Sequence, residues 1–342
     1  MATSTNRLVL PGRRALRIAA GTALCVAISF ALDLSVPIIA PVFAVFLLGT
    51  QNRPLSFKAG AAFALIVALT TGSGLLLVPL LRHYALAGVM MVGLLLFLAF
   101  RYGLRSGNNL VATFLVAGLT MISAAGTADF QLGTTMVGAL VKGLVLAVLV
   151  TALAHQLFPE PSGAPPPPAA PALSHTQAAQ IALRAALVVM PAYLLAMTDP
   201  ASYMPVIMKS VSLGRQSCTT TARGAARELI GSTLLGGLLA IAMWFALRLF
   251  VHLWMFGLWM LLCGLLVGRK LEGLSPTRYS PGFWLNGFVT MIILLGQSVQ
   301  DSIAGKDVYT AFAVRMGLFL AVAVYACVML LMLDRHRVVR NV

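Results

Sequence analysis

The stretch ALRIAAGTALCVAISFALD, residues 15–33, is the key to the architecture, because it returns in altered form as ALRAALVVMPAYLLAMTD, residues 182–199. Each copy begins with Ala-Leu-Arg, continues as an apolar run and ends at an aspartate. A short proline-bearing segment follows each copy. It is followed by Gly49 and Gln51 in the first half and by Gly214 and Gln216 in the second. Internal duplication of a multi-span unit is typical of membrane proteins whose two halves frame a central site. The repeat therefore predicts a duplicated membrane-spanning fold.

The composition independently indicates a membrane protein. Hydrophobic residues make up 60% of the chain, charged residues only 10%, and the mean hydropathy is +0.94, whereas soluble domains carry roughly 25% charged residues. The net charge of +15 would suggest a nucleic-acid partner in a soluble protein. In a membrane protein Lys and Arg accumulate in the cytoplasmic loops, so we expect lipid and not nucleic acid around this chain. The four cysteines are scattered and predict no disulfide.

Six apolar segments can be traced in each half of the chain. A spanning helix needs about 20 apolar residues. By that measure the segments lie near residues 16–32, 37–50, 59–81, 86–100, 110–125 and 134–158, and again near 182–197, 204–214, 229–250, 253–267, 283–299 and 310–333. We therefore predict an all-α integral membrane protein of about twelve transmembrane helices, built as two parallel six-helix repeats with short broken second helices.

The positions of the cations predict the topology. With the N-terminus inside, the outer loops hold only Arg82, Arg248 and Lys306, and the remaining loop cations fall on the inner side. This bias predicts a multi-pass protein of the bacterial inner membrane with both termini in the cytoplasm. We divide the chain into a first six-span repeat (1–158), a Pro-rich cytoplasmic linker (159–176) and a second six-span repeat (177–342).

Three cations fall inside predicted spans, namely Lys142, Lys209 and Arg315. A charge at bilayer depth costs at least about 2.5 kcal/mol on insertion scales, so each should face a partner, a water-filled cavity or an anionic ligand. Lys209 lies in a second segment that also carries Pro205, and paired short or interrupted segments indicate a transporter's binding site. We predict that all three cations bind substrate. Internal ion pairs, snorkelling to the interface, and a tight hairpin in the headgroup region are the alternatives.

Other polar residues complete the predicted site. Gln51 and Gln216 follow the two second segments, and Arg227 could receive an anion at the cytoplasmic entrance or serve only as a positive-inside charge. Asp33 and Asp199 end the first helix of each half, where carboxylates could exchange protons with the periplasm or could simply cap helices. Two further acids, Asp301 and Asp307, are expected to be solvated loop acids or helix caps. No metal, nucleotide, cofactor or catalytic motif is found in the sequence, and we expect no enzymatic activity.

The segment RELIGSTLLGG, residues 227–237, resembles the R-x-hydrophobic-G-T-hydrophobic-hydrophobic-G signature of the fusaric acid resistance and aromatic acid exporter superfamily. Residues 142–159 and 315–334 are similar to the closing helix of that family's six-span unit. The chain departs from the pattern in Ser232, which replaces the usual threonine, and in having no large cytoplasmic domain between the halves. The resemblance implies export of aromatic carboxylic acids or drugs, commonly beside a periplasmic adaptor, a membrane fusion protein. Plant relatives conduct organic anions as dimers of six-span units.

Together these features predict a proton-driven inner-membrane efflux transporter for anionic, aromatic small molecules, acting alone or with a periplasmic adaptor. A passive organic-anion channel, which would need no titrating carboxylate, is one alternative. A non-transporting membrane subunit of an envelope assembly is another. The duplicated chain already supplies two six-span units, and its sequence leaves further oligomerisation open.

Overall fold

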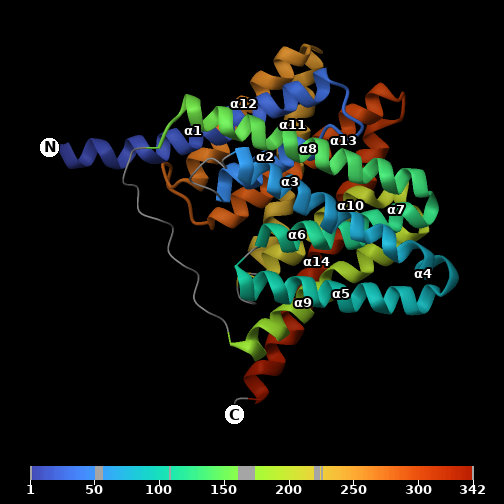
Figure 1. Ribbon diagram of the computed structural model, residues 1–342. Helices are drawn as coiled ribbons and strands as arrows, with labels where there is room; N and C mark the ends of the chain where they lie inside the picture. Colours follow the sequence, from blue (N-terminus) through green and yellow to red (C-terminus); the bar gives the residue numbers. More distant parts are fainter. Residues whose placement is uncertain are drawn as a thin grey trace. The chain divides into compact units, whose positions relative to one another are not determined.

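The computed structural model describes residues 2–50, 57–107, 109–160, 174–218, 224 and 226–340, and within them every regular element is a helix (Figure 1). The first half contains α1 (Ala2–Ala31), α2 (Ile39–Thr50), α3 (Phe57–Gly72), η1 (Ser73–Leu77), α4 (Val78–His83), α5 (Ala85–Ser106), α6 (Asn109–Ala117), η2 (Gly118–Ile122), α7 (Ser123–Ala128) and α8 (Phe130–Leu157). The second half contains α9 (His175–Thr198), α10 (Pro200–Ser217), η4 (Ala226–Gly231), α11 (Ser232–Leu249), α12 (Leu253–Leu271), α13 (Pro281–Ile303) and α14 (Val308–Arg340).

Ten helical stretches of the described residues are long and apolar enough to cross a membrane. Three of them join consecutive elements, namely α3–η1–α4, α6–η2–α7 and η4–α11. The second segment of each half is the exception, because α2 has only 12 residues and α10, with 18, does not reach the hydropathy of a span. The predicted order of segments and the all-α membrane fold are confirmed.

The two second helices begin at prolines and continue past them. Pro37 precedes α2 and Pro41 lies in its first turn, where no intrahelical N–H bond is lost. Pro200 starts α10 in the position that favours proline, and the helix runs on through Pro205 to Ser217. The prolines at the starts of these helices therefore favour the points at which the chain turns into each helix.

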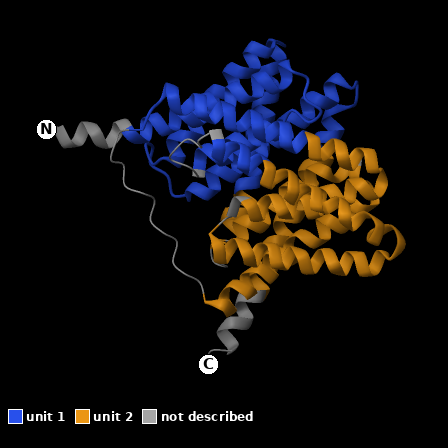
Figure 2. Cartoon of the chain, in the orientation of Figure 1, with its two compact units in different colours: residues 1–64, 139–167, 232–313 blue, residues 65–138, 168–231, 314–342 orange. Residues whose placement is uncertain are grey.

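The described chain divides into two compact units, each drawn from both halves of the sequence (Figure 2). Unit 1 comprises residues 1–64, 139–167 and 232–313, and unit 2 comprises residues 65–138, 168–231 and 314–342. In unit 1 the first helix of the first half, α1, packs along the fourth helix of the second half, α12. In unit 2 the first helix of the second half, α9, packs along the fourth helix of the first half, α5. The same pairing thus occurs once in each unit, with the halves exchanged.

The two pairings use different side chains. A Cβ added to Gly264 of α12 would lie 2.9 Å from the Cα of Ala19, and one added to Gly268 would lie 3.1 Å from the Cα of Ala15. Small residues four apart on both helices therefore bring the backbones of α1 and α12 into contact. Counted from Arg101 and Arg269, the matching positions of α5 are Leu96 and Phe100, both buried. Large side chains fill the α5–α9 contact instead.

The repeat boundaries at residues 158 and 177 follow the sequence pattern and stay a prediction. Residues 161–173, most of the Pro-rich linker, lie outside the described residues, as does Gln51.

Candidate functional site

Lys209 is the most deeply buried cation of the described chain. Its side chain is 1% exposed and is among the largest fully buried side chains. The neighbouring residues Ile207, Ser210 and Val211 are also buried, and the Ser210 hydroxyl donates to the carbonyl of Ile207 at 2.9 Å. The helix that carries it, α10, packs within unit 2 against α9 and against the α6–η2–α7 segment. The sequence singled out Lys209, and the structure places it in the interior of unit 2.

The segment that faces α10 contains a π-helical turn, η2, whose five residues are all buried. Its first residue, Gly118, meets the chain at the end of α3, because an added Cβ would lie 2.4 Å from the Cα of Thr71. An added Cβ on Gly74 would lie 2.0 Å from the carbonyl oxygen of Gly118. Glycine is required at this crossing, since any side chain would collide with backbone. Single π-helical turns are frequent at functional sites.

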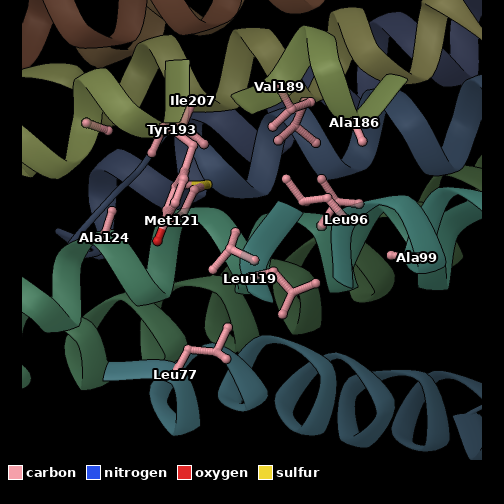
Figure 3. Packing of buried hydrophobic residues seen from close by; sticks show 14 of the residues in the cluster. Leu77, Leu96, Ala99, Leu119, Met121, Ala124, Ala186, Val189, Tyr193 and Ile207 are labelled. Carbon is pink, nitrogen blue, oxygen red and sulfur yellow. The ribbon is translucent and has the colours of Figure 1, made fainter. Parts of the chain in front are cut away.

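Apolar side chains fill the space between these helices (Figure 3). Tyr193 extends from α9 toward the α6–η2–α7 segment, where Met121 and Ala124 lie, and Ile207 of α10 lies beside it (Figure 3). The hydroxyls of Tyr193 and Ser123 are 3.3 Å apart, and both residues are buried. Tyr193 and Ser123 were not predicted as site residues, because an aromatic residue and a serine inside apolar helices give no distinctive signal. The interior of unit 2 therefore combines the buried Lys209 with apolar and aromatic surface.

The other predicted cations lie in different surroundings. Lys142 is exposed on the part of α8 that belongs to unit 1, whereas Arg315 is half-buried on the part of α14 that belongs to unit 2. Arg227 is exposed in η4. Of the three cations predicted inside spans, Lys209 and Arg315 share a unit, and Lys142 belongs to the other.

Gln216 ties two segments of unit 2 together. Its side-chain amide donates to the carbonyl oxygen of Glu228 at 3.1 Å, which joins the last turn of α10 to η4. This contact gives Gln216 a structural role at the end of the buried helix.

The two predicted proton carriers lie at helix ends. Asp199 is exposed and caps α10, its carboxylate accepting from the N–H of Ser202 at 3.3 Å. Asp33 is exposed in the turn after α1 and has a positive φ of 47°. An aspartate tolerates this left-handed conformation better than most residues. Capping and turn formation therefore account for both aspartates locally.

Asp301 and Asp307 behave differently from each other. Asp307 is exposed and caps α14, accepting from the N–H of Tyr309 at 3.1 Å and from the Thr310 hydroxyl, as predicted. Asp301 is buried in α13 with 4% exposure, so its prediction as a solvated acid is wrong. The apolar run of the sequence ends near Val299, but the helix continues to Ile303 and carries Asp301 into the buried interior.

Two buried arginines escaped the sequence-based site prediction. Arg17 and Arg184 are the matching arginines of the repeated Ala-Leu-Arg and are 3% and 5% exposed. Arg17 lies 3.4 Å from the carboxylate of Glu160, which also pairs with Arg14, whereas Arg184 donates to the carbonyl of Ser217. Their repetition in Ala-Leu-Arg is the sequence signal that could identify them, but a cation near the start of a span also fits the positive-inside bias.

The carboxyl group of Glu272, which interacts with the charge of Arg17, has a shifted pKa. Burial raises the pKa of Glu272, at the end of α12, and the carboxylate of Glu160 adds to this, while the charges of Arg14 and Arg17 oppose it. Two arginines and two glutamates thus form a mixed cluster at one end of unit 1.

Comparison with known proteins gives a family match for part of the chain. Residues 14–154 match the family model described as a protein of unknown function (DUF2955), and they span the six helical segments of the first half. No curated protein and no solved structure matches the chain. Within the described residues, ten apolar helices long enough to cross a membrane decide the class of the protein. The chain is a multi-pass membrane protein. In the described part of this membrane protein, no group of three or more His, Cys, Asp or Glu side chains could hold a metal ion.

Proposed function

We propose that the protein is a transporter that exports anionic, aromatic small molecules across the bacterial inner membrane, driven by the proton gradient, alone or with a periplasmic adaptor. The observation that carries the proposal is Lys209, which is 1% exposed inside a membrane protein. Keeping an ammonium at bilayer depth costs at least about 2.5 kcal/mol. A substrate carboxylate would offset that cost by replacing lost hydration with an ion pair.

The surroundings of Lys209 favour a substrate with an apolar body. Leu213, one turn after Lys209 on the same face of α10, is fully buried in an apolar cluster with Val188 of α9 and Ala326 of α14. Ligand sites of this kind combine a mostly apolar lining with a few polar groups that fix orientation. An aromatic carboxylate has both parts.

The remaining predicted residues have subsidiary roles in this proposal. Arg315 shares unit 2 with Lys209 and would stabilise the same negative charge at another stage of transport. Lys142, Gln51, Gln216 and Arg227 would contact the anion along its path, and Asp33 and Asp199 would carry protons. Both termini would be cytoplasmic, and no enzymatic step is involved.

The proposal is tested by uptake of a labelled aromatic carboxylate into inverted membrane vesicles with an imposed proton gradient. We expect accumulation that collapses with an uncoupler. Lys209→Met should abolish accumulation, because it removes the positive charge. Lys209→Arg should retain part of it, because arginine keeps the charge but differs from lysine in shape. Lys306→Met, which removes an exposed loop cation, is the matched control and should transport normally. Normal transport by correctly inserted Lys209→Met would refute the assignment.

A passive anion channel is the second candidate, and the exposed aspartates favour it. Asp33 and Asp199 form a turn and a helix cap, so their presence is explained without proton transfer. In a channel, the combined Asp33→Asn and Asp199→Asn variant would equilibrate the anion at the wild-type rate. In a proton-driven exporter, the same variant would lose uphill accumulation. The two functions are distinguished by this one comparison.

A further inference from the structure

A second feature of unit 2 is an apolar groove of about 460 Å³ between η1, α5 and η2. Its lining includes Ser73, Leu77, Leu95, Leu98, Tyr102 and Leu119. Among its lining residues, Leu77, Ala99 and Leu119 are buried in the core (Figure 3), whereas Leu98 and Tyr102 are 45% and 47% exposed. The volume lies within the range of about 300–1,000 Å³ typical of ligand sites. The proposed transport function does not use this groove.

The groove is almost without free polar groups. The hydroxyl of Ser73 donates to the carbonyl of Thr70 at 2.7 Å and is therefore already engaged. Among the lining residues only Tyr102 offers another polar group. Such a surface fits a hydrocarbon chain better than a polar aromatic molecule.

Positive charge lies one turn beyond the groove on the same helix. Leu98, Tyr102 and Arg105 follow one another at spacings of four and three residues, so they share a face of α5. Seven residues of helix separate Leu98 from Arg105, a rise of roughly 10 Å. A guanidinium nitrogen of Arg105 lies 3.3 Å from Nε2 of His175, the first residue of α9, and Arg101 is half-buried nearby on α5.

We propose that this groove binds an acyl chain of an anionic phospholipid, with the lipid phosphate at Arg101 and Arg105. The apolar lining accommodates the chain, and the arginines complement the headgroup charge at the end of the same helix face. Basic residues between membrane helices are a recognised setting for anionic headgroups. A lipid held here would cover the side of unit 2 where the helix irregularities η1 and η2 meet.

The test is native mass spectrometry of the full chain in detergent, titrated separately with phosphatidylglycerol and phosphatidylcholine of identical acyl chains. We expect the first phosphatidylglycerol to bind more tightly than phosphatidylcholine, by about fivefold for each arginine beside the headgroup, because the choline cation offsets the phosphate charge of phosphatidylcholine. The double variant Arg101→Gln and Arg105→Gln should remove this preference. Leu98→Trp, which fills the groove from its exposed edge, should weaken both lipids several-fold and keep the preference.

The matched control is Arg269→Gln with Lys270→Gln, at the corresponding end of α12 in unit 1. This variant should bind the first phosphatidylglycerol as the wild type does. Equal binding of the two lipids by the wild type would overturn the proposal. An equal loss in the control, or an unchanged affinity in Leu98→Trp, would also overturn it, because headgroup attraction alone would then suffice. Thermal unfolding in detergent checks that each variant is folded.

Discussion

The contact of α1 with α12 and that of α9 with α5 occupy matching places in the repeat but are built differently. In unit 1, Gly264 and Gly268 let two backbones touch. In unit 2 the same places hold Leu96 and Phe100, and the contact is filled by side chains. The spans next to them differ as well, because α13 is continuous whereas its counterpart α6–η2–α7 contains a π-helical turn. The helix pairing is thus the same in the two units, whereas the irregular helices η1, η2 and η4 and the buried Lys209 lie in unit 2.

The largest effect is expected from Leu96→Ala in unit 2. Leu96 is fully buried, so truncation leaves a cavity and should lower the free energy of unfolding by about 2–5 kcal/mol. Leu94→Ala on the same helix, where the side chain is 53% exposed, is the control and should cost far less. The free energy of unfolding of both variants is measured in a series of mixtures of a mild and a denaturing detergent. Equal losses would show that the α5 contact is not packed as described.

Gly264→Ala should break the tighter contact of unit 1. The new methyl group would lie 2.9 Å from the Cα of Ala19, so the helices must separate, at a cost of about 1–3 kcal/mol. Gly257→Ala on the same helix meets nothing closer than 3.9 Å and should be neutral or stabilising, since alanine favours helix. Opposite signs for the two variants, read from thermal unfolding, are the expected result. A neutral Gly264→Ala would contradict close backbone contact.

The matching arginines sharpen the comparison further. Glu160→Gln removes the carboxylate beside Arg17, whose side chain is 3% exposed, and should destabilise unit 1 by about 1–2 kcal/mol. Arg184 in unit 2 instead donates to the backbone carbonyl of Ser217, a bond that no side-chain substitution at Ser217 removes. Proteolysis near residue 160 should also become faster in Glu160→Gln, because Arg13 and Arg14 hold this segment through Pro159 and Glu160. An unchanged cleavage rate would contradict a stabilising role for the bonds from Arg13 and Arg14 to this segment.

The smallest effect concerns the caps of the last helix of each half. The Thr310 hydroxyl and the N–H groups of Tyr309 and Thr310 lower the pKa of Asp307. This cap therefore stabilises the fold above the unfolded pKa, near 3.9, and the contribution is lost as pH falls through the lowered folded value. Asp307→Asn should flatten the change in melting temperature between pH 5 and pH 2 relative to the wild type. Asp129 caps α8 by accepting from the N–H of Gln131 at 2.9 Å, so Asp129→Asn is the control for changing a helix cap in the first half.

The sequence predicts the helices well and their partners poorly. Apolar length and Ala-Leu-Arg located the spans, because a bilayer demands about 20 apolar residues per helix. Hydropathy does not predict that α1 packs on α12, because lipid-facing and helix-facing residues are equally apolar. The spacing of Gly264 and Gly268 indicates a close helix contact but does not identify the partner helix. The depth of Lys209 was predicted from its place in an apolar segment. The π turn at Gly118 could not be predicted, because it lies at a close approach to Thr71 of another helix, which the sequence does not reveal.

Because each unit contains helices from both halves of the sequence, neither unit can complete its packing until late in translation. Unit 1 needs α1, which is made first, and α12 and α13, which are made late. During translation α1 must therefore remain in the bilayer for roughly ten seconds or more, at usual rates of synthesis, with its small-residue face uncovered. A chain stopped after the first half would retain six helical segments without either completed unit. The arrangement is that of a domain-swapped dimer joined into a single chain, and two separately expressed halves would have to exchange helices in order to complement each other.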